Sequence, residues 1–161
     1  KRARRTGYVN TISIKNEIIH GDNTDGIGFV KDMKNNIEYD FNDKKILLVG
    51  AGGAAMGVIP SILNENPSEL KIYNRTFEKA KSLSDSFENI GPVEAVSQDK
   101  IHKHNFDLII NATSNSRSVF NCDLYLGLDL LTIRLTPKGL VVCALMAKMA
   151  FLNSSSVIVL F

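Results

Sequence analysis

The sequence predicts an α/β protein in which a doubly wound parallel sheet carries helices on both faces. The segment at residues 45–49 is continuously apolar after its first lysine and is followed by glycine, which is typical of a strand buried on both faces. Strand-like and helix-like segments then alternate as far as residue 111, which indicates βαβ units. The 161 residues, of which 44% are hydrophobic and 22% charged, suffice for about one domain with its own core.

The segment before that strand is expected to form a hairpin and a helix. Residues 8–14 and 17–20 have the composition of two short strands, with a turn at residues 15–16. Thr24 then precedes a helical pattern and is expected to cap it. The apolar residues expected along one face of this helix are Ile27, Val30, Met33 and Ile37. The helix is expected to end at residues 35–36.

The rest of the predicted fold repeats a strand followed by a crossover. The expected elements are a helix over residues 54–64, a strand over 70–73, a helix over 77–88, a strand over 93–96, a polar crossover over 98–104 and a strand over 106–111. Pro60 lies inside the first helix and is expected to kink it or remove a hydrogen bond. The apolar stripe expected on the second helix consists of Phe77, Ala80, Leu83 and Phe87. Beyond about Ser114 the apolar segments have no clean period, so no element is predicted there.

Composition and charge argue against several classes of protein. Cys122 and Cys143 form no CxxC pair and have no metal-ligand spacing, so neither a zinc site nor an oxidising compartment is implied and a cytoplasmic location is expected. Polar residues 153–156 divide the apolar C-terminal segment into pieces too short to cross a bilayer, so no membrane contact is expected. Four of the first five residues are basic. Such a run can contact nucleic acid, but we favour a solvated terminal segment and expect no nucleic-acid partner.

A glycine turn follows the first buried strand of the predicted sheet. In the pattern Gly50-x-Gly52-x-x-Ala55, the first glycine permits a tight turn and the second has no Cβ to block a diphosphate. Ala55 is small enough for a helix to pack closely on the strand. Exposed amides at the start of that helix then face the phosphates. The pattern therefore predicts a Rossmann-like dinucleotide site, although a tight turn that binds nothing has the same local sequence.

The end of the second predicted strand indicates which dinucleotide binds. Asn74-Arg75-Thr76 contains no carboxylate, whereas NAD-binding folds place one near this position to hold the ribose 2′-hydroxyl. The Arg75 guanidinium can pair with a 2′-phosphate, and Lys79 adds charge one helical turn later. These residues favour NADP over NAD, unless Arg75 is simply a solvated loop residue. Thr113, at the end of the strand over 106–111, is also placed to approach the cofactor.

Two polar residues near the predicted hairpin are candidates for the substrate side. Asn10 and Asp25 are separated by a hairpin that can return the chain to the same cleft. A carboxylate can accept a proton from a reacting hydroxyl while an amide orients it. The alternative is that Asp25, together with Asp22, caps the following helix.

Five motifs in order resemble the shikimate dehydrogenase family over about two thirds of the chain. They are Val9-Asn10-Thr11, Gly21-Asp22-Asn23-Thr24-Asp25-Gly26, Gly50-Ala51-Gly52-Gly53-Ala54-Ala55, Asn74-Arg75-Thr76 and Asn111-Ala112-Thr113-Ser114. The resemblance implies reversible NADP-dependent reduction of 3-dehydroshikimate to shikimate in aromatic amino-acid (chorismate) biosynthesis. It implies substrate contacts for Asn10 and Asp25, with Asp25 acting in proton transfer beside a lysine. The residues implied to bind cofactor are Gly50, Ala51, Gly52, Gly53, Ala54, Asn74, Arg75, Thr76, Lys79 and Thr113.

The sequence also departs from the family pattern at both ends. Family members carry their catalytic lysine in an N-terminal substrate domain well before the Asn10 motif, and Lys1 lies too close to be that lysine. We therefore expect residues 1–35 to be a remnant of the substrate-domain edge with a linking helix, and residues 36–130 to form the NADP-binding domain. Residues 131–161 are expected to be an atypical apolar tail, through divergence or a shifted reading frame.

These departures shape the expected activity. We expect an incomplete fragment with weak or no turnover on its own, small-molecule partners (shikimate and 3-dehydroshikimate) and a possible homodimer. A non-catalytic NADP-binding module and a quinate/shikimate dehydrogenase that uses NAD are the alternatives.

Overall fold

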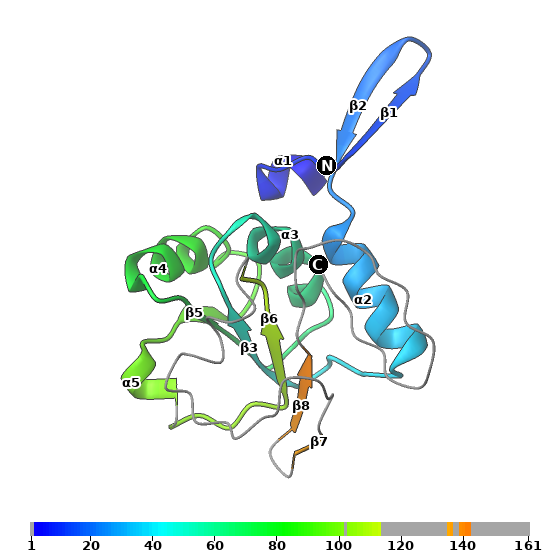
Figure 1. The fold of residues 1–161 in the computed structure, drawn as a ribbon. Helices are drawn as coiled ribbons and strands as arrows, with labels where there is room; N and C mark the ends of the chain where they lie inside the picture. The colour runs from blue at the N-terminus through cyan, green and yellow to red at the C-terminus, as the bar shows by residue number, and fades with distance from the viewer. Residues whose placement is uncertain (1, 102, 114–134, 137–138, 143–161) are drawn as a thin grey trace.

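A six-stranded sheet covered by helices forms the main body of the protein, and a two-stranded hairpin projects from it (Figure 1). The structure is a computed structural model that describes residues 2–101, 103–113, 135–136 and 139–142. The strands of the sheet are β3 (Lys45–Val49), β4 (Glu69–Tyr73), β5 (Val93–Ala95), β6 (Leu108–Asn111), β7 (Leu135–Thr136) and β8 (Gly139–Val142). The helices are α1 (Arg2–Thr6), α2 (Asp25–Asn36), α3 (Gly53–Leu63), α4 (Phe77–Asp85) and α5 (Gln98–Ile101).

The strand order reverses beside β3, at the centre of the sheet. The order is β5-β4-β3-β6-β8-β7, and every neighbouring pair is parallel except β7 with β8. From β3 the chain moves outward through β4 to β5, and then crosses back to β6 on the other side. In register, Val49 lies beside Tyr73 on one side and Asn111 on the other, so three strands end level. Ligands of doubly wound sheets bind at such a reversal, beyond the carboxyl ends of the strands.

The central strand β3 is buried on both faces, as its continuous apolar sequence predicts. Ile46 and Leu48 belong to the core beneath α2, α3 and α4. Leu47 and Val49 face the opposite side, where Ile101 of α5 covers them as part of a second cluster. The predicted α/β fold with helices on both faces is therefore confirmed, and the predicted bounds of this strand are exact.

In two helices, the residues that are buried differ from those predicted to form the apolar face. In α2, Phe29 is fully buried, whereas Ile27 is only partly buried. In α4, Phe77 is 41% exposed, because it is the first helical residue and lies before the turn that contacts the sheet. α3 continues through the buried Pro60, which has no N–H to donate, so one hydrogen bond is missing within the helix as predicted.

The hairpin consists of β1 (Thr11–Lys15) and β2 (Ile18–Asp22), which pair antiparallel. Its turn is Asn16-Glu17, one residue later than predicted, and both residues have positive φ, as a tight two-residue hairpin turn requires. Tyr8, Val9 and Asn10 precede β1 rather than belonging to it. The isoleucines of the strands are 60–72% exposed.

Several elements had no counterpart in the predictions. The polar crossover contains the short helix α5, and β7 and β8 extend the sheet beyond β6. Apart from β7 and β8, the predicted tail over 131–161 lies outside the described residues, as does Ser114, and the proposed division into domains stays a prediction. None of the helices in the described part of the chain has the length and hydropathy needed to cross a membrane.

Candidate functional site at the carboxyl ends of the strands

The turn after β3 has a backbone conformation that only glycine adopts easily. Gly50 has a φ of +115°, and a Cβ at this position would lie 2.8 Å from the carbonyl oxygen of Ala112. The Gly50 amide donates to the carbonyl of Tyr73 at 2.8 Å, and the Ala112 amide donates to the carbonyl of Val49 at 2.8 Å. The turn is therefore tied to the strands on both sides of β3.

The turn leads directly into α3 and leaves the beginning of that helix open. Gly52 is the N-cap residue, and a Cβ built on it meets no atom within 4 Å. Ala54 and Ala55 are buried against the sheet, so the helix packs closely on β3. The first amides of α3 and the positive end of its dipole face this open side, which suits an anion. Gly50, Ala51, Gly52, Gly53 and Ala54 thus have the arrangement that the motif predicts.

The segment after β4 lies at the same edge of the sheet. The Asn74 side-chain amide donates to the carbonyl of Thr76 at 2.9 Å, which closes the turn before α4. Thr76 is the N-cap residue of α4, and the amide of Lys79 donates to its carbonyl at 3.1 Å. Arg75 and Lys79 are exposed. Two exposed cations therefore follow the end of β4, the strand whose last residue, Tyr73, accepts from the Gly50 amide.

The end of β6 supplies a polar pair at the strand reversal. Asn111 is buried, and its Oδ1 accepts from the Thr113 amide at 3.0 Å and the Thr113 hydroxyl at 2.8 Å. Because a backbone amide can only donate, these bonds fix the orientation of the Asn111 side chain. Within the described residues its Nδ2 has no partner. The sequence motif includes both residues, but it assigned a cofactor contact to Thr113 only and no role to the asparagine that orients it.

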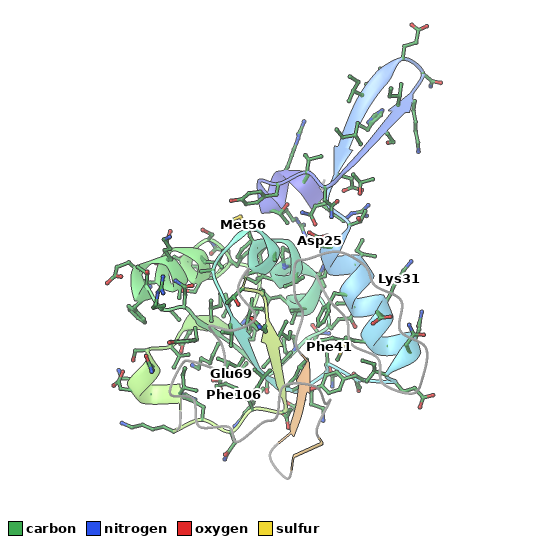
Figure 2. All side chains as sticks on the ribbon, in the orientation of Figure 1. Asp25, Lys31, Phe41, Met56, Glu69 and Phe106 are labelled. Atoms are coloured by element: carbon green, nitrogen blue, oxygen red, sulfur yellow. The ribbon has the colours of Figure 1, made fainter. Side chains whose placement is uncertain are left out.

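The two candidate substrate residues come together as predicted. The Asn10 Nδ2 donates to Asp25 Oδ1 at 2.5 Å, and Asn10 Oδ1 accepts from the Thr24 amide at 3.0 Å and the Thr11 hydroxyl at 2.9 Å. Thr24 is the N-cap residue of α2, but its side chain makes no capping bond, which corrects the predicted capping role. Its hydroxyl instead contacts the Thr11 hydroxyl at 3.1 Å. Asp25 lies at the end of α2 nearest the hairpin (Figure 2).

The substrate side rests on the helix that follows the glycine turn. A Cβ on Gly57 would lie 3.3 Å from Asp25 Oδ2 and 3.4 Å from Asn23 Oδ1. Four residues earlier on the same helix, a Cβ on Gly53 would lie 3.5 Å from the Tyr8 ring. The two sides of the site therefore meet along one face of α3. The positions of Tyr8 and Asn23 against α3 were not predicted, because they depend on tertiary contacts, although Asn23 belongs to a quoted motif.

A second carboxylate near the hairpin has a structural partner. The Arg2 guanidinium makes a two-pronged contact with the Asp22 carboxylate, and this hydrogen bonding lowers the pKa of Asp22. Asp22 also accepts from the Asn23 amide at 2.9 Å. Asp22 is thus engaged with neighbouring donors, whereas Asp25 is the carboxylate that contacts Asn10.

Comparisons with known proteins agree on one family. The family model described as Shikimate / quinate 5-dehydrogenase matches residues 32–129. Curated proteins named shikimate dehydrogenase (NADP(+)) are 43% identical over 116 residues in Chromobacterium violaceum and 48% identical over 115 residues in Photobacterium profundum. These alignments cover 72% and 71% of this chain, but 42% of each relative. The chain therefore spans less than half the length of these relatives.

Solved structures give the same result. Shikimate dehydrogenase from Aquifex aeolicus is 33% identical with a TM-score of 0.66, covering 88% of this chain and 49% of that one. Shikimate 5-dehydrogenase from Thermus thermophilus, in complex with NADP(H) and shikimate, is 30% identical with a TM-score of 0.60, covering 70% and 40%. The family match takes in the glycine turn and the ends of three strands at the reversal. The chain belongs to the shikimate / quinate 5-dehydrogenase family.

Proposed function

We propose that this chain carries the NADP-binding part of a shikimate dehydrogenase, which reversibly reduces 3-dehydroshikimate to shikimate. The observation that carries the proposal is the meeting of the glycine turn, Arg75 and Thr113 at the ends of three adjacent strands, where the strand order reverses. The named function of the curated relatives supports it.

The residues at this edge fit a dinucleotide with a 2′-phosphate. The open side of Gly52 and the first amides of α3 suit a diphosphate, which needs hydrogen-bond donors and close approach to the backbone. The exposed Arg75, together with Lys79 four residues later, suits a second phosphate on the adenosine ribose. No carboxylate occupies residues 74–76, where it would repel that group. Thr113, oriented by Asn111, stands on the other side of the turn.

The substrate side supplies proton transfer. NADP, when bound, would supply the acceptor for the hydride that leaves the carbon bearing the reacting hydroxyl. Asp25 takes the proton from that hydroxyl, and Asn10 holds both the carboxylate and the substrate oxygen in place. The family resemblance pairs this aspartate with a lysine before the Asn10 motif. We therefore propose that the 161 residues alone turn over shikimate slowly or not at all, because positioning and proton transfer are both incomplete.

Cofactor titration tests this proposal. The chain is titrated with NADPH and with NADH, following nucleotide fluorescence, alongside Arg75→Ala and the matched control Lys45→Ala. Lys45 is an exposed cation at the opposite end of β3. Arg75→Ala is expected to weaken NADPH binding by at least about tenfold and to leave NADH binding unchanged, because charge-assisted hydrogen bonds to phosphate are lost. The proposal fails if NADPH shows no saturable binding, or if wild-type chain prefers NADH.

A second experiment separates an enzyme fragment from a binding module. The chain is assayed with shikimate and NADP, alone and joined to an N-terminal segment of a relative that carries the family lysine. Restored turnover that Asp25→Asn removes supports the enzyme. NADPH binding without any restored turnover favours a non-catalytic module.

A further inference from the structure

An aromatic side chain outside the family motifs lies against the glycine turn. Three ring carbons of Tyr8 (Cε1, Cδ1 and Cζ) are 3.5–3.7 Å from the position that a Cβ on Gly53 would occupy. A side chain at this position would thus be in ordinary van der Waals contact with the ring, so the ring lies over the face of Gly53, the first residue of α3. In sequence, Tyr8 is 45 positions away from that glycine.

The Tyr8 backbone is held in place by neighbouring polar groups. Its amide donates to the Thr6 hydroxyl at 3.4 Å, and its carbonyl accepts from that hydroxyl at 3.2 Å and from the Asn23 side-chain amide at 3.4 Å. The preceding helix α1 lies against α3 (Figure 1). The ring therefore sits on a fixed segment rather than on a free terminus.

Core packing does not account for this ring. Tyr8 is 50% exposed and belongs to neither buried cluster of the described residues. A half-exposed tyrosine presents a rigid apolar face together with a hydroxyl that can donate to a ligand. Because Cζ is the ring atom that bears the hydroxyl, the donor lies one bond beyond an atom already close to Gly53. Gly53 directly follows Gly52, and a Cβ built on Gly52 meets no atom within 4 Å, so space for a ligand remains next to this ring.

We infer that Tyr8 is a further cofactor-binding residue, whose ring forms one wall of the diphosphate site and whose hydroxyl donates to a phosphate oxygen. This inference rests on the proposed function. The ring covers the side of α3 that faces Asn10 and Asp25, so the same short segment, residues 8–10, contacts the cofactor turn and the substrate side. The diphosphate then lies between amides from α3 and a hydroxyl from the N-terminal segment.

Removing only the hydroxyl tests the inference. Tyr8→Phe keeps the ring and its packing, and Tyr39→Phe is the matched control, because Tyr39 lies in the loop that leads to the opposite end of the sheet. Each variant is titrated with NADPH and with adenosine 2′-monophosphate, which carries the 2′-phosphate but no diphosphate. Thermal unfolding of each variant is recorded alongside.

Tyr8→Phe is expected to weaken NADPH binding by about tenfold, the effect of losing one hydrogen bond to a charged group. Adenosine 2′-monophosphate binding and the unfolding temperature are expected to match wild type, which a merely structural role of Tyr8 would not predict. Wild-type affinity for NADPH in Tyr8→Phe would overturn the inference, as would equal weakening of both nucleotides. Absence of NADPH binding to the wild-type chain would instead overturn the proposed function together with this inference.

Discussion

The cofactor side and the substrate side of the site are held by different means. On the cofactor side, the glycine turn follows β3, in which four of the five residues are buried. On the substrate side, Asn10 and Asp25 lie at the base of the β1–β2 hairpin, in which nine of ten strand residues are exposed. Apolar content does not explain the contrast, because the hairpin strands also carry four isoleucines.

The difference in burial instead depends on whether other helices and strands pack against these residues. The cross-strand pairs place Ile12, Ile14 and Ile19 on one face of the hairpin, and Thr11, Ser13 and His20 on the other. The hairpin thus has the alternating pattern of a half-buried sheet, yet the three isoleucines of its apolar face are 70–72% exposed. A two-stranded sheet gains little stability alone. The substrate side is therefore positioned by short polar contacts and by α3, whereas the cofactor side is positioned by the core.

The largest expected difference is in the free energy of unfolding, between a variant in the core strand β3 and a variant in the hairpin. Leu48→Ala, in the fully buried centre of β3, is expected to lower the free energy of unfolding by roughly 4 kcal/mol, because it removes buried methyl groups and leaves a cavity. Ile14→Ala, at a position that is 70% exposed, is expected to change it by less than about 0.5 kcal/mol. Urea unfolding monitored by circular dichroism measures both. Comparable losses in the two variants would show that the hairpin is as well packed as the sheet.

The second prediction concerns the glycine turn. Gly50→Ala is expected to cost about 3 kcal/mol of unfolding free energy, because the new Cβ combines a positive φ with close approach to the Ala112 carbonyl. Gly52→Ala is the matched control. Its Cβ enters open space, so it is expected to leave stability within about 1 kcal/mol of wild type while hindering NADPH. Equal stability of Gly50→Ala and Gly52→Ala would contradict the account of this turn.

The smallest effect concerns the ion pair between α1 and the hairpin base. Since Arg2 lowers the pKa of Asp22 in the folded protein, the pair favours folding above the ordinary aspartate pKa, and this contribution disappears as pH falls through the lowered value. The unfolding temperature of Asp22→Asn is therefore expected to lie slightly below wild type near about pH 7, and to converge with it below about pH 4. Thermal melts across this range provide the measurement. A gap that widens on acidification would contradict the assignment.

Local signals were sufficient for strands β3 to β6 and for the cofactor turn. Residues 46–49 are apolar throughout and lead into a glycine, so the strand and its turn follow from sequence neighbours alone. The displaced hairpin turn shows a limit of such signals, because Glu17 adopts a positive φ that its residue type disfavours. β8 could not be predicted from a local period, because its assignment depends on pairing with β6 across many residues.

The residues of the site also fall into those that the local sequence predicts and those that depend on tertiary contacts. Arg75 and the glycine turn were found because each follows a strand end, where the fold class itself predicts a ligand. The contact of Asn10 with Asp25 was suggested by spacing and a hairpin, and the structure brings the two side chains together. The position of Tyr8 over α3 was not predicted, since it depends on a contact between residues far apart in the sequence, and Asn111 was part of a quoted motif without a role of its own, since its role depends on its bonds to Thr113.

The most direct measurement is a crystal structure of the chain grown with NADP. The account predicts electron density for the diphosphate within hydrogen-bonding distance of the amides at Gly52 and Gly53, and for the 2′-phosphate against the Arg75 guanidinium. Nucleotide bound elsewhere, or bound with its 2′-phosphate turned away from Arg75, would contradict it.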